Sequence, residues 1–117
     1  MQIHLKQVEV GAIDSLRDLY RQEMDCQIVH DSYHRRGFTT PYLISFNGRI
    51  VGYATVTNGS HRAVPAGTVT EVYLSPSYRA FSDPIFRQLL VASGAKRIEA
   101  QTNDVFLTLM FLISLKK

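Results

Sequence analysis

Six residues at the start of a predicted helix give the strongest indication of chemistry in this chain. They are Arg79-Ala80-Phe81-Ser82-Asp83-Pro84, and they follow a strand predicted over residues 68–74. A helix that begins just beyond a strand end directs its free backbone N–H groups and the positive end of its dipole toward that place. This arrangement predicts an anion site, the usual position for a phosphate-bearing ligand.

The same six residues can also be interpreted as an ordinary helix start. Ser82 or Asp83 is a suitable N-cap, and Pro84 sits where a missing N–H costs little. The turn contains no glycine, so the Ser82 side chain occupies space near a phosphate and Pro84 removes one N–H donor. The Asp83 carboxylate would also repel a phosphate at the positive end of the dipole. An anion site and a helix cap both stay open.

The other reactive side chains show no spacing typical of a catalytic or metal site. Four histidines have no paired spacing with carboxylates or cysteine: His4, His30, His34 and His61. His30-Asp31 and His34 would share a helical face as an acceptor-binding or metal site, but surface histidines are commoner, and we expect no metal. Cys26 is alone, which excludes an intrachain disulfide. Three tyrosines are expected to pack in the core or line a groove: Tyr33, Tyr42 and Tyr53.

Length and composition are those of one ordinary globular domain. The chain has 117 residues, of which 45% are apolar and 20% charged, so we expect a single domain over residues 1–117. A net charge of +3 favours acidic ligands weakly, and without a dense Lys/Arg cluster we expect no nucleic-acid partner. The N-terminus lacks a signal-peptide block, and the apolar tail 105–115 is shorter than the roughly 20 residues that span a bilayer. We expect a cytoplasmic protein without a membrane partner.

Hydrophobic periodicity predicts the first two elements. Residues 3–8 alternate as in a short strand. Residues 12–24 form an amphipathic helix, with apolar residues recurring at three- and four-residue steps: Ile13, Leu16, Leu19, Tyr20 and Met24. The polar face is predicted to hold Asp14, Arg17, Asp18, Arg21 and Glu23. Residues 25–40 are expected to form a broken helix and a loop that ends at Gly37 and Pro41.

The rest of the chain alternates strands and helices. Residues 42–46 and 49–57 flank Asn47-Gly48, a pair that supplies the two positive φ angles of a tight hairpin. The strand at 68–74 leads through the helix, which ends at Gly94, to a strand at 97–102, and we expect these strands to be parallel neighbours. A final helix is predicted over 105–117, with Asp104 as its N-cap. The order indicates a mixed sheet with helices on its faces, an α/β or α+β fold.

With this order, three stretches make the chain resemble the GNAT superfamily of acetyl-CoA-dependent N-acetyltransferases. The stretches are FNGRIVGYATV at 46–56, TEVYLSPSYR at 70–79 and GAKRIEAQTN at 94–103, and the resemblance runs from residue 3 to about residue 110. It implies a mostly antiparallel sheet with helices on both faces and one parallel strand pair that splays apart. Family members usually continue into two more strands, and we expect this domain to be without them.

The resemblance implies acetyl-CoA as co-substrate. The backbone of the strand's last three residues would pair with the pantetheine amides, and the pyrophosphate would rest on the turn and the helix that follows. The implied cofactor-binding residues are Val72, Tyr73, Leu74, Arg79, Ala80, Phe81, Ser82, Asp83, Pro84 and Asn103. The family pattern in the turn is Gln/Arg-x-x-Gly-x-Gly/Ala. Arg79 matches it, whereas Ser82 and Pro84 depart from it. Asn103-Asp104 can also be an ordinary strand-to-helix turn.

The implied reaction is direct attack by a substrate amine on the acetyl thioester, which needs a base, donors for the oxyanion and an acid for the thiolate. Glu71 is the expected base, because it lies on the strand beside the acetyl site. Val69 and Tyr73 are expected to share its face, with Thr70, Val72 and Leu74 on the other. The alternative for Glu71 is an ordinary solvated strand residue. No tyrosine follows Tyr78, so the acid role that a late tyrosine often has in the family is vacant or filled by water.

Two functions follow from these observations. The first is an N-acetyltransferase acting on an amine of a small molecule or peptide. The second is a GNAT-fold binding or regulatory protein with weak or no catalysis, suggested by the glycine-free turn, the missing tyrosine and the short end; a damaged gene product is a third, weaker interpretation. Because the final helix is apolar on nearly every face, we expect a homodimer through this helix or the adjacent strand edge.

Overall fold

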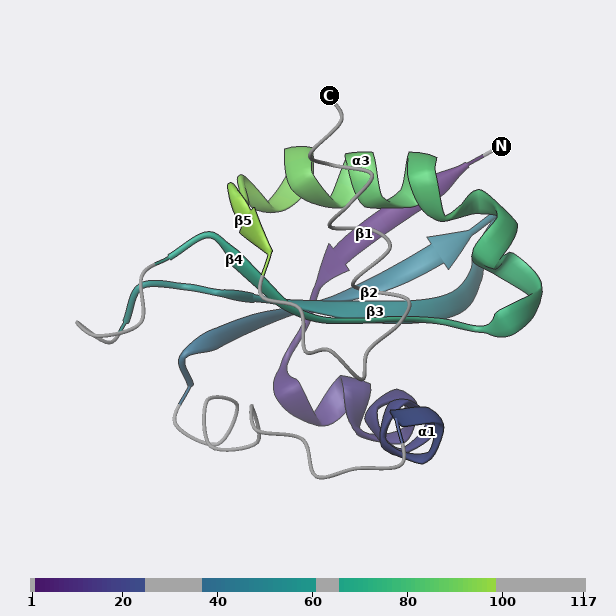
Figure 1. Ribbon diagram of the computed structural model, residues 1–117, viewed down its shortest axis with the longest axis horizontal. Coiled ribbons are helices and arrows are strands. Elements are labelled where there is room, and N and C mark those ends of the chain that lie inside the picture. Colours follow the sequence, from purple (N-terminus) through teal and green to yellow (C-terminus); the bar gives the residue numbers. More distant parts are fainter. Residues whose placement is uncertain (1, 25–36, 61–65, 99–117) are drawn as a thin grey trace.

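The computed structural model describes residues 2–24, 37–60 and 66–98 (Figure 1). The elements in chain order are strand β1 (Ile3–Gln7), 3-10 helix η1 (Val10–Ile13), helix α1 (Asp14–Met24), strands β2 (Thr39–Phe46), β3 (Arg49–Thr57) and β4 (Thr68–Leu74), 3-10 helix η2 (Pro76–Phe81), helix α3 (Ser82–Ser93) and strand β5 (Arg97–Ile98). The predictions for Asn103, for the final helix and for a dimer through it fall outside the described residues.

A five-stranded sheet in the order β1-β2-β3-β4-β5 forms the middle layer. Neighbouring strands from β1 to β4 are antiparallel, whereas β4 and β5 are parallel through the pairs Thr68↔Arg97 and Val69↔Ile98. Helix α1 lies against one face of the sheet and α3 against the other (Figure 1). The predicted fold class is confirmed, and so is the parallel pairing across α3. Splaying of the pair beyond Ile98 lies outside the described residues.

The hairpin forms as predicted, but its first strand begins earlier. Asn47 and Gly48 take φ angles of 51° and 84°, as the tight turn requires. Strand β2 starts at Thr39, so Pro41 lies in the strand and not at the end of a loop. The Pro41 carbonyl accepts a hydrogen bond from the Val8 N–H at 3.0 Å, so it faces β1, just past the last β1–β2 pair. The Pro41 nitrogen, which carries no hydrogen, therefore also faces β1, and the hydrogen bonds between β2 and β3 are not interrupted.

The α1 side of the sheet covers most of the predicted apolar face, namely Ile13, Leu16 and Tyr20, together with one residue that was assigned to the polar face. Ile13, the last residue of η1, is buried together with Arg17 and Tyr20 of α1, whereas Leu19 is 44% exposed. These three residues are spaced four and three apart, so they lie on one face, which turns toward the sheet. The assignment of Arg17 to the solvent face was wrong, because a buried partner on the sheet satisfies its charge.

Two apolar clusters hold the layers together. On the α3 side, residues of β2, β3 and β4 pack with Ile85, Phe86 and Leu89 of the helix. On the α1 side, a smaller cluster is largely aromatic and is built from Ile13, Tyr20, Tyr53 and Tyr73. Tyr20 and Tyr53 meet edge to face, with ring centroids 6.2 Å apart. Tyr53 is thus a core residue, one of the two roles expected for it.

Helix α3 ends as predicted but begins differently. Gly94 takes the left-handed conformation at φ 68° and closes the helix. At the other end the N-cap is Phe81, not Ser82 or Asp83, and no side chain caps the helix. The reason is that η2 runs directly into α3, so the chain is already helical at Ser82. Phe46 packs against Phe81 with ring centroids 4.8 Å apart and anchors this junction to the hairpin.

Gly52 marks a close approach between β3 and β4. A Cβ atom at this position would lie 1.9 Å from the Tyr73 carbonyl oxygen, a backbone atom inside the sheet. We therefore expect Gly52→Ala to lower the free energy of unfolding by about 2 kcal/mol or more. Gly11→Ala is the matched control, because a Cβ there meets nothing within 4 Å. Chemical denaturation of both variants measures the difference, and equal stabilities would contradict the close packing.

Candidate active site

Strand β4 is buried along its whole length. All seven of its residues, Thr68–Leu74, are buried, because neighbouring strands flank it and a helix covers each face. Val72 and Leu74 pack on the α3 side, whereas Tyr73 belongs to the α1-side cluster. The last residues of β4, where the resemblance places the acetyl group, are therefore held from both faces.

A bulge at Thr70 changes the alternation expected along β4. Thr55 pairs with Glu71 and Val56 pairs with Val69, so Thr70 is an extra residue between two successive pairs. Val69 consequently packs on the α3 side together with Val72. The expectation that Val69 shares a face with Glu71 was wrong, because the bulge reverses the alternation at this point. The Thr70 hydroxyl lies 2.7 Å from the Thr55 hydroxyl, and this hydrogen bond closes the bulge.

Glu71 sits at the centre of a buried polar group beneath α1. The Arg17 Nε donates to Oε1 at 2.9 Å and Nη2 donates to Oε2 at 3.0 Å, so the ion pair uses both carboxylate oxygens. The Tyr53 hydroxyl donates to Oε1 at 2.8 Å. Glu71 is 0% exposed and Arg17 is 5% exposed. The alternative of a solvated strand residue was therefore wrong.

The surroundings fix the protonation state of Tyr53. Burial raises the pKa of its phenol far above the usual value, and the nearby Glu71 carboxylate raises it further by charge and by hydrogen bonding. Tyr53 thus stays neutral and keeps its proton for the bond to Glu71. The bidentate guanidinium of Arg17 meanwhile stabilises the carboxylate charge.

This geometry limits how Glu71 can act as a base. Both carboxylate oxygens already accept hydrogen bonds from the protein. A ligand can give a proton to Glu71 only if the ligand replaces one of these hydrogen-bond donors. The Tyr53 hydroxyl is the easier donor to replace, because it is uncharged and its bond is weaker than those from the Arg17 guanidinium. The Glu71 carboxylate thus lies on the strand where the base is expected, but the contacts that it makes are those of a structural ion pair.

Arg79 folds back onto the end of β4. Its Nε donates to the Leu74 carbonyl at 2.9 Å, and its guanidinium carbon lies 5.6 Å from the centroid of the Tyr73 ring. Three of the residues implied in cofactor binding are thus brought together. The Leu74 carbonyl marks the strand end, so Arg79 places a positive charge where β4 meets η2.

The segment 79–84 is helical and does not form an open loop. The Ser82 N–H donates to the Arg79 carbonyl, which uses one of the donors expected for an anion. Asp83 pairs with Arg87 one turn later, at 3.2 Å, so a neighbouring cation offsets the charge expected to repel a phosphate. Pro84 lies in the first turn of α3, where no intrahelical N–H is lost. Ala80 and Phe81 are exposed.

Sequence reasoning missed two residues of the buried group, Arg17 and Tyr53. Arg17 carried a detectable signal, since it falls on one helical stripe with Ile13 and Tyr20. The sequence signal for Tyr53 was weaker: the residue was expected to pack in the core or line a groove, but nothing local indicated its hydrogen bond to Glu71. The pairing of Arg17 with Glu71 joins residues 54 positions apart, and no local pattern predicts such a contact.

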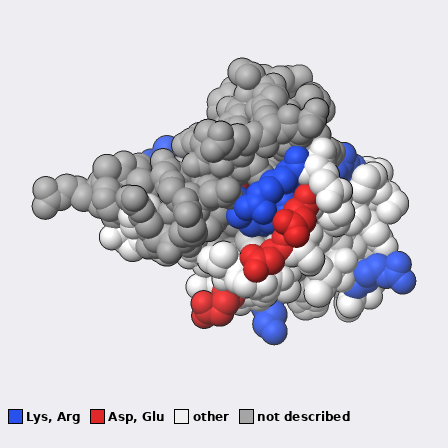
Figure 2. All heavy atoms as spheres, turned by 90° about the horizontal axis from the view of Figure 1, so that it is seen from below, with Lys and Arg blue, Asp and Glu red and all other residues white. Residues whose placement is uncertain are grey.

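The α1 side of the molecule carries charges of both signs. Figure 2 shows acidic and basic side chains next to one another on this side. Arg21 and Asp18 form one such pair on α1, at 3.1 Å. Among the described residues, no group of three or more His, Cys, Asp or Glu side chains is placed to hold a metal ion. No described helix is long and apolar enough to cross a membrane.

No protein-family model matches the sequence, and no curated protein matches it. Solved structures do. A GNAT-family acetyltransferase from Colwellia psychrerythraea superposes with a TM-score of 0.63 at 17% identity, over 94% of this chain and 41% of that one. A GNAT-family acetyltransferase from Streptococcus pneumoniae superposes with a TM-score of 0.57 at 17% identity, over 99% of this chain and 87% of that one. A predicted acetyltransferase from Clostridium acetobutylicum, solved with acetyl-CoA, superposes with a TM-score of 0.56 at 10% identity, over 94% of this chain and 88% of that one.

These likenesses show that the chain has the GNAT fold, which confirms the fold that the resemblance implied. The chain spans less than half of the Colwellia protein and most of the other two. At these identities the superposition concerns the path of the backbone and not the chemistry of individual side chains.

The raised pKa of Tyr53 predicts a loss of stability in alkaline solution. Below the usual phenol pKa of 10.0, Tyr53 is protonated in both states. Above it the unfolded chain loses the proton while the folded chain keeps it, so the free energy of unfolding falls by up to about 1.4 kcal/mol per pH unit. We expect Tyr53→Phe to remove this part of the slope in denaturation curves measured from pH 9 to pH 11, roughly the range that the linkage requires.

Tyr42→Phe is the comparison variant for this experiment. Burial also raises the pKa of Tyr42, but its side chain is only partly buried. Its removal should therefore flatten the slope less than Tyr53→Phe does. An alkaline slope that Tyr53→Phe leaves unchanged would show that Tyr53 titrates normally in the folded state.

Proposed function

We propose that the protein is an acetyl-CoA-dependent N-acetyltransferase that moves the acetyl group to an amine of a small molecule or peptide. The observation that carries the proposal is the end of β4. In a fold shared with acetyltransferases, one of which was solved with acetyl-CoA, a fully buried strand ends beside Arg79 and the start of α3. The acceptor amine is left open, because loops set it in such folds.

In this proposal the backbone of Val72, Tyr73 and Leu74 pairs with the pantetheine amides. Arg79 and the first turn of α3 hold the pyrophosphate, with the helix dipole adding to the attraction. Arg79 exchanges its bond to the Leu74 carbonyl for one to phosphate, which frees that carbonyl for the co-substrate. Asp83 remains paired with Arg87 and so repels the phosphate less than an isolated carboxylate would.

The reaction is a direct transfer. The amine nitrogen attacks the thioester carbonyl carbon, a C–N bond forms, the C–S bond breaks, and CoA leaves as the thiolate. The amine proton goes to the proposed base, Glu71, after the ligand replaces Tyr53 at Oε1. A water molecule protonates the thiolate, and the hydroxide left behind takes the proton back from Glu71, which restores the carboxylate. Arg17 holds the carboxylate in place throughout.

The competing function is a GNAT-fold binding or regulatory protein with weak or no catalysis. Two observations favour it: both oxygens of Glu71 are already bonded, and segment 79–84 is helical and lacks glycine. Such a protein would still bind a ligand at the end of β4 but would not turn it over. Binding and turnover therefore need separate experiments.

Calorimetric titration with acetyl-CoA tests binding. We expect saturable binding to the wild-type chain and about tenfold weaker binding to Arg79→Gln, which loses a charge-assisted contact to phosphate. Arg21→Gln is the matched control, because it removes the same charge from helix α1, where Arg21 pairs with Asp18 at 3.1 Å. Absence of heat and of any thermal shift at millimolar acetyl-CoA would end the enzyme proposal for this chain.

Glu71→Gln and Arg17→Gln separate a base from a structural carboxylate. Each breaks the buried pair and should lower the free energy of unfolding by about 3 kcal/mol or more. If Glu71 is the base, Glu71→Gln lowers kcat per folded molecule by about 100-fold or more, and Arg17→Gln lowers it less, because that variant loses only the positioning of the carboxylate. Thiol release from acetyl-CoA, with spermidine or a lysine peptide as acceptor, measures kcat below the melting temperature of both variants. Equal losses in the two variants would assign Glu71 to the ion pair alone.

A further inference from the structure

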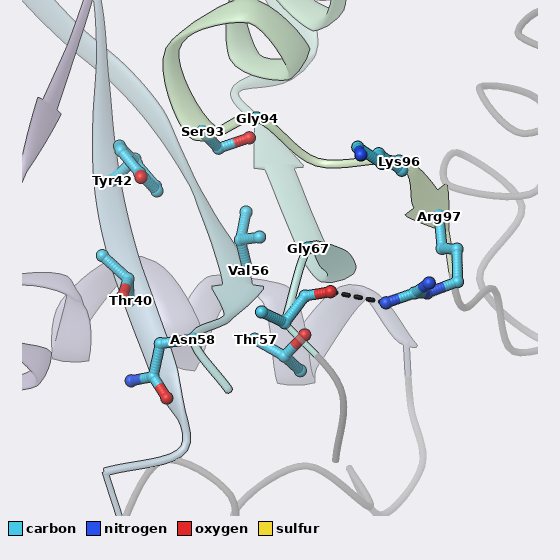
Figure 3. A pocket seen from close by; sticks show the side chains of 11 residues that line it. Thr40, Tyr42, Val56, Thr57, Asn58, Gly67, Ser93, Gly94, Lys96 and Arg97 are labelled. Atoms are coloured by element: carbon cyan, nitrogen blue, oxygen red, sulfur yellow. Dashed lines mark hydrogen bonds between the residues drawn. The ribbon is translucent and has the colours of Figure 1, made fainter. Parts of the chain in front are cut away.

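A cavity lies at the other end of α3 from segment 79–84 (Figure 3). Its volume is about 470 Å³. Helix α3 is 12 residues long, so about 18 Å separates this cavity from the proposed pyrophosphate site. The end of α3, the segments before β4 and β5, and the outer ends of β2 and β3 surround it. We call it the α3-end pocket.

The two sides of the α3-end pocket differ in character. Tyr42 and Val56 pack on the α3-side core and give the pocket an apolar floor, and Thr40 lies two residues before Tyr42 on the same face. Lys96 and Arg97 lie across the pocket from Thr40 and Tyr42 (Figure 3). None of the described lining residues is acidic, so the pocket has a positive side and an apolar side.

Gly67 fixes the wall that carries the cations. Its N–H donates to the Thr57 carbonyl at 2.9 Å, and its own carbonyl accepts from the N–H groups of Lys96 at 2.8 Å and Arg97 at 3.1 Å. The φ angle of 84° at Gly67 allows this arrangement. The end of β3 and the start of β5 are therefore tied together through one residue, and the pocket is built before any ligand arrives.

Three polar groups of the pocket have no partner among the described residues. They are the Lys96 ammonium and the hydroxyls of Tyr42 and Thr40. Arg97, in contrast, is held in place: its Nε donates to the Thr68 hydroxyl at 3.1 Å and its Nη2 donates to the Ala66 carbonyl. One side of the pocket thus offers a cation without a partner among the described residues beside a cation that is held in place, and the other side offers two hydroxyl groups.

We propose that the α3-end pocket binds a small organic oxyanion. Its carboxylate or phosphate oxygens contact Lys96 and Arg97, and its apolar or aromatic part lies on Tyr42 and Val56 with the two hydroxyls as further hydrogen-bond partners. A competing role for Lys96 is to offset the negative end of the α3 dipole. That role explains the cation but not the unpaired hydroxyls opposite it. The proposal does not depend on the acetyltransferase function.

Phenyl phosphate is a suitable probe, because it joins an oxyanion to an aromatic ring. We expect saturable shifts of the amide NMR signals of Gly67, Gly94 and Lys96, and about tenfold weaker binding to Lys96→Met. Lys6→Met is the matched control: Lys6 is exposed on β1 and pairs with Leu43, whose side chain packs on the α1 face of the sheet. Thr40→Val should also weaken binding and leaves the charge unchanged. Arg79→Gln should have no effect, which keeps this pocket distinct from the proposed acetyl-CoA site.

Several results would overturn the proposal. One is the absence of saturable shifts at the pocket. Another is equal weakening by Lys6→Met, which would reveal general attraction to a basic protein. A third is phenol binding as tightly as phenyl phosphate, because an apolar cavity would then explain everything. If Lys96→Met only lowered the melting temperature and left probe affinity unchanged, Lys96 would serve the helix end alone.

Discussion

The buried ion pair between Arg17 and Glu71 is the contact on which the arrangement of the α1 side depends. It joins the first long helix to the most buried strand, and the Tyr53 hydroxyl brings in β3. Charges removed from water are stable only when each finds its partners, so α1 has one position on the sheet in which Arg17 is satisfied. Apolar packing by Ile13 and Tyr20 alone would tolerate small rotations of the helix, whereas a bidentate pair does not.

What the sequence could predict follows from how local each feature is. The Asn47-Gly48 hairpin, the limits of β4 and the Gly94 helix end depend on a few adjacent residues, and all three appear as expected. The bulge at Thr70 depends on how β3 pairs with β4, so it reversed the face of Val69 without a local signal. The contact between Arg17 and Glu71 also depends on tertiary structure, so no local pattern could predict it. Apolar spacing assigns every charged residue to the surface, and Arg17 was therefore placed there.

The segment 79–84 shows how tertiary contacts choose between two local interpretations. Ser-Asp-Pro is compatible with a helix cap and, less well, with a phosphate turn. Packing of Phe46 against Tyr78 and Phe81 holds η2 in line with α3, so the helix begins without a side-chain cap. The side chain of Arg79 therefore has greater weight in any anion contact than the backbone donors that the sequence suggested.

The buried pair also restricts how this sequence can drift. Replacing either Arg17 or Glu71 alone leaves an unpaired charge in the interior and destabilises the fold. Exchanging both for apolar residues of similar size costs far less stability. Neutral change at these two positions must therefore pass through an unstable intermediate, and descendants of this chain should keep both residues or lose both. Such a coupled pair gives a test of kinship at identities too low for ordinary alignment.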